Sequence, residues 1–403
     1  MKSYSFLIDY QCPQCGAPAT LSETDRLFAC NYCRTKSFLM DLDGFRYRFQ
    51  PASAPGEDLV YVPYWRFKGM LFTCTTAGVM PKFVDVSLQA TPSRHLPVTL
   101  GLRSQALKLS YVTPDTPGRF IAPELSRRDM LKAVGERFPG GSGTAALHQC
   151  EIGESASLVY APYRIRDRII DGILETPITG PLSDGELEAF AGGPPTAGVR
   201  ILPTLCPRCG WDMVGHKDAH LMTCRNCETV WVPDPEGFKR MGAAVMGTGD
   251  NDAYLPFWRI QAEVEGLPLS SYEDLSIAAN LPRAPQDDWK DRPFRFWSPA
   301  FKIRPGAFLQ IMRTVTLGQP DGPTTRRLPN RSPVSANLPY REALETITMN
   351  IAAWLTPPKR YSSELPRIRI RPKKIRLVYL PFSDGHHEFV MDSLSLAVRK
   401  SHL

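Results

Sequence analysis

The chain contains 403 residues, of which 43% are hydrophobic and 22% are charged, and it carries a formal net charge of +7 at pH 7. This composition is that of a globular protein of two or three domains, and it argues against a disordered chain. The net charge is modest for this length, so it gives no strong indication of a nucleic-acid partner. No uninterrupted apolar run of about 18 residues could span a bilayer, and the N-terminal residues lack a cleavable apolar segment. We therefore expect a cytoplasmic protein without a transmembrane segment.

The first feature along the chain is a pair of Cys-x2-Cys motifs, and a second pair with the same internal spacing occurs in the second half. Four thiolates at this spacing form the tetrahedral set that a structural zinc ion requires, in the arrangement of a zinc ribbon. Gly16 and Gly210 follow the first motif of each pair, where a left-handed backbone is often needed. The sequence therefore predicts two zinc ions, with the ligands Cys12, Cys15, Cys30, Cys33, Cys206, Cys209, Cys224 and Cys227.

Iron is the competing metal, because rubredoxin-like centres also use four cysteines. Their usual form has a glycine after both motifs, whereas the second motifs here read CNYCR and CRNCE. An iron electron carrier is therefore the weaker interpretation. The two remaining cysteines, Cys74 and Cys150, are expected to be buried free thiols of a protein in a reducing compartment.

The segments that follow each ribbon predict mainly β structure. They contain runs of strand length, rich in aromatic and β-branched residues, such as YWRFKGMLFTCTTAG, KFVDVSLQA, FRFWSPAFKI and RTVTL. We expect antiparallel sheets from these runs. Clusters of glycine and proline separate the parts of the chain. The predicted domains are a first zinc ribbon at 1–50, a first β-rich body at 57–191, a second zinc ribbon at 199–241 and a second β-rich body at 253–403.

Few helices are predicted. Ser126 and Asp129 resemble a capping box at the start of a helix that Pro139 ends, and a shorter helix is expected after Ser183. Pro339 begins a third helix, which Pro357 closes. The expected fold class is therefore mainly β with a few helices (α+β).

The two halves also match outside the cysteines, at offsets of 193 or 194 residues for three segments and 219 for a fourth. Divergent copies rarely keep such spacing by chance, so the sequence predicts an internal duplication in which each half is a ribbon plus an antiparallel β-rich body. The matched segments are CPQCG (12–16) with CPRCG (206–210), VYVPYWRF (60–67) with AYLPFWRI (253–260), SQALKL (104–109) with SPAFKI (298–303), and VYAPYRI (159–165) with VYLPFSD (378–384).

The Tyr-x-Pro-aromatic segments allow two interpretations. Their aromatic side chains could line a groove that stacks bases or receives a peptide. The alternation of apolar and polar residues after them favours strands that enter a sheet with one face buried. The side chains concerned are Tyr61, Tyr64, Trp65, Tyr254, Phe257 and Trp258.

Alternating arginines give the best indication of a partner surface. In RIRIRPKKIR at 367–376, arginines fall on one face of a predicted strand and isoleucines on the other. A cationic stripe of this kind can bind phosphates through charge and counterion release, or it can be a solvated face or contact an acidic protein. The candidate partner-binding residues are Arg164, Arg166, Arg168, Arg367, Arg369 and Arg371.

Sequence patterns for catalysis are weak, and no site for a small-molecule substrate is evident. His386, His387 and Glu388 are adjacent, so on a strand they would point to opposite faces. His216 and His220 lie in the loop of the second ribbon, where four cysteines make a further ligand unnecessary. We expect no enzymatic activity.

The knuckles CPQCG with CNYCR and CPRCG with CRNCE resemble the zinc ribbons of the transcription factor IIB type. A ribbon followed by YVPYW or YLPFW is similar to a group of uncharacterised bacterial zinc-ribbon proteins. This resemblance implies the eight cysteines as metal ligands and nothing catalytic. The sequence thus favours a scaffold or accessory subunit that binds one or more proteins of a larger complex, with nucleic-acid binding through residues 164–168 and 367–376 as the alternative.

Overall fold

The computed structural model describes residues 6–41, 43–101, 107–139, 145–196, 198–247, 253–282, 286–357 and 363–403. Strands make up 40% of the structure and helices 17%, so the predicted class of a mainly β protein with a few helices is confirmed. None of the helices within these ranges has the length and apolar character needed to cross a membrane.

The chain forms two compact units that do not follow the predicted domain bounds. The first unit contains Met1–Gly69, Val84–Arg137 and Gly153–Pro203, and the second contains Met70–Phe83, Phe138–Ile152 and Thr204–Leu403. The second unit therefore includes two segments from the first half of the chain.

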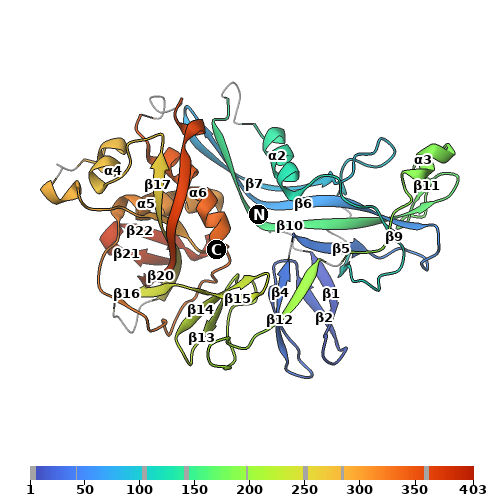
Figure 1. Ribbon diagram of the computed structural model, residues 1–403, viewed down its shortest axis with the longest axis horizontal. Helices are drawn as coiled ribbons and strands as arrows, with labels where there is room; N and C mark the ends of the chain where they lie inside the picture. Colours follow the sequence, from blue (N-terminus) through green and yellow to red (C-terminus); the bar gives the residue numbers. More distant parts are fainter. Residues whose placement is uncertain are drawn as a thin grey trace. The chain divides into compact units, whose positions relative to one another are not determined.

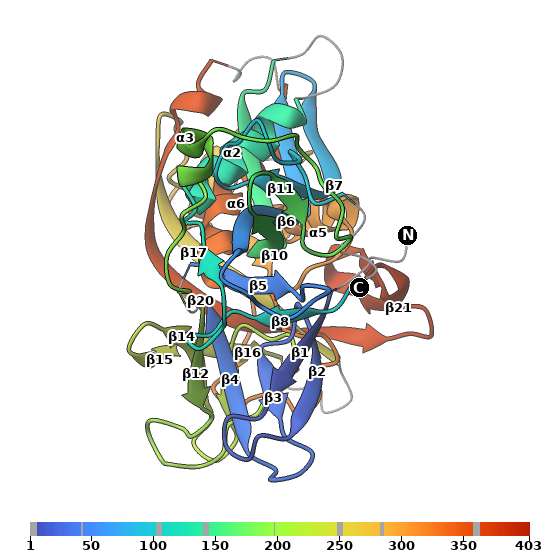
Figure 2. The same ribbon diagram turned by 90° about the vertical axis from the view of Figure 1, so that its right-hand side faces the viewer.

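The first ribbon opens the first unit. Its strands are β1 (Leu7–Gln11), β2 (Pro18–Ser22), β3 (Leu27–Ala29) and β4 (Lys36–Asp41). A fifth strand, β12 (Val199–Pro203), comes from much later in the chain and pairs antiparallel with β4, beside which Figure 2 shows it. The buried side chain of Leu202 belongs to this strand. The residues just before the second ribbon thus complete the sheet of the first.

The remaining strands of the first half continue the sheet begun by β1 and β2, in the order β2-β1-β8-β5-β10-β6-β7, with β11 paired to β10 and β9 to β6. These strands are β5 (Phe45–Phe49), β6 (Leu59–Thr75), β7 (Gly78–Gln89), β8 (Leu109–Tyr111), β9 (Arg119–Phe120), β10 (His148–Ile165) and β11 (Ile169–Asp171). The helices in the described part of this half are α2 (Arg127–Arg137), with Ser126 just before it and Asp129 in its first turn, and α3 (Asp184–Glu188), which has the predicted capping box of Ser183 and Glu186.

The second ribbon comprises β13 (Met222–Cys224), β14 (Thr229–Asp234) and β15 (Gly237–Met241). A further sheet has the order β18-β17-β20-β16-β19, and Figure 1 shows its long strands β17 and β20 side by side. Its members are β16 (Ala243–Met246), β17 (Ala253–Glu265), β18 (Phe296–Pro299), β19 (Thr324–Thr325) and β20 (Arg369–Asp384), with β21 (Glu388–Met391) and β22 (Leu396–Arg399) attached to the end of β20.

The residues of this unit that the structure describes form three helices: α4 (Tyr272–Ala278), α5 (Pro305–Gly318) and α6 (Tyr340–Trp354). Short 3-10 turns occur at Asp287–Trp289, Leu365–Arg367, Asp392–Leu394 and Lys400–His402.

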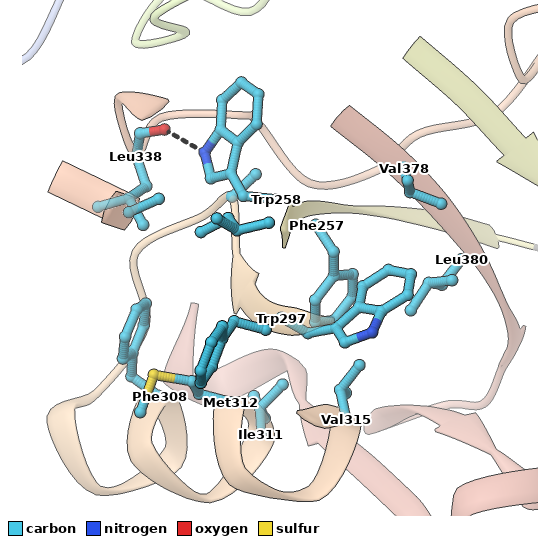
Figure 3. Close-up of a cluster of buried hydrophobic side chains, with 14 of the residues drawn as sticks. Phe257, Trp258, Trp297, Phe308, Ile311, Met312, Val315, Leu338, Val378 and Leu380 are labelled. Atoms are coloured by element: carbon cyan, nitrogen blue, oxygen red, sulfur yellow. Dashed lines mark hydrogen bonds between the residues drawn. The ribbon is translucent and has the colours of Figure 1, made fainter. Parts of the chain in front are cut away.

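Alternation along β17 supplies the core of the second unit on both faces of its sheet. Trp258 points to one side, where its indole nitrogen donates to the carbonyl oxygen of Leu338 at 2.9 Å, while Phe257 points to the other side (Figure 3). On that second side Trp297 lies near the helix that carries Phe308, Ile311, Met312 and Val315, all of them buried. The same core cluster contains Met70, Phe72, Cys74, Cys150 and Ile152.

Some predictions of local structure were wrong. RTVTL is not a strand but the end of α5, because Phe308, Ile311, Met312 and Val315 recur at helical spacing and Pro305 starts the helix. The sheets are also mixed rather than antiparallel, since β5 runs parallel to β10 and β16 runs parallel to β20. Long helix-containing connections between the members of each pair permit this arrangement.

A hydrogen-bonded link joins strand, loop and helix start in the first half. The amide of Ala90 donates to the carbonyl of Pro63 at 3.0 Å, and the amide of Leu125 donates to the carbonyl of Ala90 at 2.9 Å. The indole of Trp65 then donates to the carbonyl of Leu125 at 2.7 Å. This link fixes the residue just before the cap of α2.

The second half contains a link of the same form. The amide of Ala300 donates to the carbonyl of Pro256 at 3.0 Å, and the amide of Leu338 donates to the carbonyl of Ala300 at 2.9 Å. The indole of Trp258 completes this link by donating to the carbonyl of Leu338, which lies just before α6. Ala90 and Ala300 thus make the same two kinds of backbone bond. The predicted match of SPAFKI with SQALKL pairs Ala300 with a residue outside the described ranges.

Candidate metal centres

The eight predicted ligands converge in two clusters, in each of which the four sulfur atoms lie within 4.8 Å of one another. In the first cluster, Cys12 and Cys33 Sγ are 3.6 Å apart and Cys15 and Cys30 Sγ are 3.7 Å apart. Four sulfurs placed about 2.3 Å from a central ion at tetrahedral angles are about 3.8 Å from one another. The first cluster therefore fits a tetrahedrally bound metal ion.

The second cluster has the same geometry. Cys206 and Cys227 Sγ are 3.7 Å apart, and Cys209 and Cys224 Sγ are 3.5 Å apart. The two clusters together could hold two metal ions. Both zinc and iron accept four thiolates in this arrangement, so the geometry fits either metal.

The knuckle backbone explains why these short motifs aim their sulfurs at one point. Gly16 and Gly210 adopt φ values of 72° and 73°, in the left-handed region that the sequence predicted. The amide of Gly16 donates to the carbonyl of Cys12 at 2.8 Å, and the amide of Gly210 donates to that of Cys206 at 2.9 Å. In the second knuckle of each ribbon the left-handed residue is not glycine. It is Arg34 (φ 60°) in the first ribbon and Glu228 (φ 51°) in the second.

Hydroxyl and backbone groups next to the clusters favour thiolates. The Thr35 hydroxyl lies 3.3 Å from Cys33 Sγ, and it lowers the pKa of Cys33 to about 6 together with a backbone hydrogen bond. The Asn226 side chain, with the backbone of Trp211, lowers the pKa of Cys209 to about 6. Since the thiolate is the form that binds metal, these contacts favour the binding form of Cys33 and Cys209. In the same clusters the pKa values of Cys15 and Cys224 are raised to about 12.

The first ribbon is tied to its unit by a buried ionic cluster. Glu23, in the turn between β2 and β3, is 1% exposed and forms ion pairs with Arg66 and Lys68 of β6, which are 3% and 0% exposed. Ser155 donates to the same carboxylate at 3.0 Å, and Asp85 pairs with Arg66 at 3.0 Å. Removing one partner of such a cluster leaves an uncompensated buried charge, so the ribbon is an integral part of the unit.

The second ribbon is held by another set of contacts, mostly to the segment that precedes α6. Arg225 donates to the carbonyl of Pro329 at 2.7 Å, the amide of His220 donates to Ala336 at 3.0 Å, and Asn337 donates to the carboxylate of Asp218 at 2.6 Å. Two of these bonds go to backbone carbonyls and one goes to a carboxylate, and none of the three is a buried ion pair like that of Glu23.

The two other cysteines are buried, as predicted. Burial raises the pKa of Cys74 to about 12 and raises that of Cys150 as well. Both therefore remain neutral thiols in the core of the second unit.

The arginines at 164–168 lie around the end of β10 instead of on one strand. Arg164 is 9% exposed, and both Arg164 and Arg166 pair with Asp58, at 2.7 and 2.8 Å. Arg168 pairs with Asp167 at 2.7 Å. Their charge is thus largely compensated within the unit.

The arginines at 367–371 also differ from the prediction of a three-member stripe. Arg367 is the last residue of the 3-10 turn Leu365–Arg367 before β20, in which Pro366 occupies an early position, and only Arg369 and Arg371 lie on the strand. Arg371 pairs with Glu265 at 2.8 Å. Ile368 and Ile370 pack against the core, as the alternation predicted.

The aromatic residues of the Tyr-x-Pro segments are all buried, with exposed fractions of 0–6%, which confirms the interpretation as core strands. His386 and His387 contact each other through their rings, 4.3 Å between centroids, in the turn between β20 and β21. Nothing in the sequence pointed to the burial of Glu23, Arg66 and Lys68, because charges that alternate along a strand normally indicate a solvated face.

Comparison of the chain with models of protein families, with curated proteins and with solved structures found no match in any of the three sets.

Proposed function

We propose that the protein is a non-enzymatic scaffold or accessory subunit that holds two zinc ions and mediates protein–protein assembly. Each cluster offers four thiolates, which fill a tetrahedral coordination sphere and leave no position for a substrate, as in structural zinc sites. Both ribbons are anchored to their own units, so metal binding would stabilise surfaces of defined shape.

The observation that carries the proposal is the exposure of large apolar side chains at the knuckles. Tyr32, between Cys30 and Cys33, is 73% exposed, and Trp211, next to the first knuckle of the second ribbon, is 61% exposed. Leu205 is 54% exposed just before that knuckle. Tyrosine and tryptophan dominate the binding energy of protein interfaces, and metal-fixed turns would present them without ordering cost.

The test is purification of the tagged protein from its own host with and without nuclease, followed by identification of stoichiometric partners. Trp211→Ala should remove a nuclease-resistant partner while metal content stays unchanged. Ile277→Ala, at an equally solvated site on α4 with 64% exposure, is the matched control and should retain it. A partner that survives both Trp211→Ala and Tyr32→Ala would contradict the proposal.

Zinc rather than iron is proposed because the residue after each second knuckle is not glycine. Elemental analysis of the purified protein should find two zinc equivalents in a colourless solution. A coloured protein with iron at the clusters would instead indicate an electron carrier.

We also propose that the halves are copies of one unit. Support comes from the two cysteine clusters, the paired glycines at the same φ, and the two links from the Tyr-x-Pro strand to the start of a helix. The parallel pairs β5–β10 and β16–β20 occupy corresponding places.

Nucleic-acid binding is the second candidate, because Arg367 and Arg369 are exposed and none of the described carboxylates pairs with them. The ion pairs of Arg164, Arg166, Arg168 and Arg371 count against it. Charge reversal at Arg367 and Arg369 should abolish retention of nucleic acid if this function holds, and unchanged retention would exclude these residues as the site.

A further inference from the structure

A pocket of about 260 Å³ lies inside the second unit, between the second ribbon and the segment 328–336. Val214, Leu221 and Arg225 line it from the ribbon, and Leu328 and Val334 line it from the segment. Tyr379 of β20 forms a further wall. This site could not be predicted from the sequence, because its walls come from three separate parts of the chain.

Apolar and polar atoms both form the walls, the apolar atoms somewhat more of them, and the volume is that of a small ring compound. A cavity of about 150 Å³ lined by aliphatic and aromatic side chains is enough for benzene. The pocket is larger than that cavity, so it has room for a ring that carries a substituent. An apolar body of this size is therefore the part of a ligand that the walls would hold.

Tyr379 and Arg225 bring hydrogen-bond donors to the pocket. Tyr379 is 5% exposed, and its hydroxyl forms no hydrogen bond within the described part of the chain. Burial raises the pKa of Tyr379 to about 12, against the effect of nearby Arg225, so the hydroxyl keeps its proton. Arg225 uses one guanidinium nitrogen on Pro329 and has further N–H donors.

The histidine at the rim uses a ring nitrogen within the protein. His216 Nε2 lies 3.2 Å from the carbonyl oxygen of Ser332, an atom that can only accept, so this nitrogen carries a proton. A single arginine charge with neutral donors matches one negative charge better than the two of a phosphate.

The first half shows what a filled version of this place looks like. There the ring of Phe120 packs against Tyr160 at 5.1 Å and stacks on Tyr61 at 4.6 Å. Tyr160 is matched in sequence by Tyr379. The residues of the segment 328–336 that line the pocket include no aromatic side chain, so nothing in this segment takes the place of the Phe120 ring.

We propose that the pocket binds a small aromatic carboxylate, with the ring between Leu221, Val334 and the ring of Tyr379 and the carboxylate on Arg225 and the Tyr379 hydroxyl. The bound ring packs against Tyr379 as the ring of Phe120 packs against Tyr160 in the first half. This site is independent of the proposed assembly role, since it requires neither a partner nor the exposed knuckle residues.

The test is titration of the full-length, metal-loaded protein with benzoate, 4-hydroxybenzoate and indole-3-carboxylate, followed by calorimetry and by saturation-transfer NMR. At least one should bind saturably at or below about 1 mM. Benzamide, which keeps the ring and loses the charge, should bind at least tenfold more weakly, and inorganic phosphate should not compete.

Variants then locate the site. Tyr379→Phe should weaken binding about five- to tenfold and Arg225→Gln at least tenfold, with metal content measured because Arg225 lies between two ligands. Tyr160→Phe in the first half is the matched control and should change nothing. Ala336→Leu should block the pocket.

Three results would overturn the proposal: no binding of any probe at about 10 mM, equal binding of benzamide, or unchanged binding in both Tyr379→Phe and Arg225→Gln. The second and third outcomes would assign any observed binding to another surface. None of the three would bear on the zinc content or on the partner lost in Trp211→Ala, so the two proposals fail separately.

Discussion

At the scale of single residues, the cysteines decide most of what the chain can be. Four thiolates within 4.8 Å of one another would repel or oxidise unless a cation holds them, so the ligands and the local fold depend on each other. The two clusters lie in different units and share no ligand.

We predict that Cys12→Ser removes one metal equivalent and unfolds the first ribbon, while Cys206→Ser does the same to the second. Metal analysis should find one equivalent in each variant and none in the double variant. Cys74→Ser, at a buried thiol outside both clusters, is the control that should keep two. Two equivalents in either ligand variant would contradict the assignment.

A second prediction concerns Glu151 of β10. Burial, with Glu345 nearby, raises its pKa from the ordinary value of 4.5 to about 7. Between these values the folded protein binds more protons than the unfolded chain, so the free energy of unfolding falls as pH rises through this window. Glu151→Gln should remove that loss and stabilise the protein by about 2 kcal/mol above pH 7.

Denaturant unfolding at about pH 5 and pH 8 measures this difference. The control is Glu136→Gln, whose carboxylate is exposed on α2 and should leave the pH dependence unchanged. A variant of Glu151 with the same pH slope as the parent would show that the carboxyl titrates normally.

The sequence predicted the metal ligands and the left-handed glycines because knuckle geometry depends on residues a few positions apart. It did not predict the partners of its charges. Arg66 and Lys68 alternate with aromatic residues just as a solvated face would, and only the folded chain brings Glu23 to them.

At the scale of elements, the contact between α5, α6 and β18 depends on one buried amide. Asn350 Nδ2 donates to the carbonyl of Trp297 at 3.2 Å and lies 2.9 Å from the Thr316 hydroxyl, and Oδ1 accepts from the Trp354 indole at 3.1 Å. The side chain thus satisfies groups from all three elements.

We predict that Asn350→Leu destabilises the protein by about 2–4 kcal/mol, because the indole N–H and the carbonyl lose their partner in a buried place. Gln310→Leu, on the exposed face of α5, should stay within about 0.5 kcal/mol. Denaturant unfolding curves compare the two. Equal stability of Asn350→Leu and the parent would mean that an apolar side chain replaces the amide without loss.

Element type was predictable where a local signal was present and long enough. The capping residues at the start of α2 and α3 predicted those helices. The segment RTVTL taken alone indicated a strand, because the helical spacing of apolar residues becomes visible only from Phe308 onward. The pairing of β12 with β4 could not be predicted, because it joins residues that the chain separates by most of the first half.

At the scale of the whole molecule, the second unit is assembled from both halves of the sequence. Met70, Phe72, Cys74, Cys150 and Ile152 are at most 3% exposed and belong to the core that also contains Trp258 and Trp297. The clusters of glycine and proline between ribbons and bodies did not predict this arrangement. Such clusters mark where a helix or strand ends, and they do not show which core that helix or strand packs into.

We predict that a fragment of residues 1–203 exposes these side chains. The fragment should keep one metal equivalent, bind a hydrophobic dye and associate. The full chain should neither bind the dye nor associate. A fragment with Met70→Ser and Phe72→Ser should bind less dye. Gel filtration and dye fluorescence provide the measurement, and a monomeric fragment without dye binding would show that its core is complete.

The assignment of Met70–Phe83 and Phe138–Ile152 to the second unit also determines the order in which the protein can mature on the ribosome. Both segments emerge before residues 204–403 exist, and synthesis of that remainder takes roughly 10–40 s at about 5–20 residues per second. During this interval their apolar side chains have no core to enter. The nascent first half is therefore a substrate for chaperones, and slow codons placed after residue 203 would lengthen its exposure.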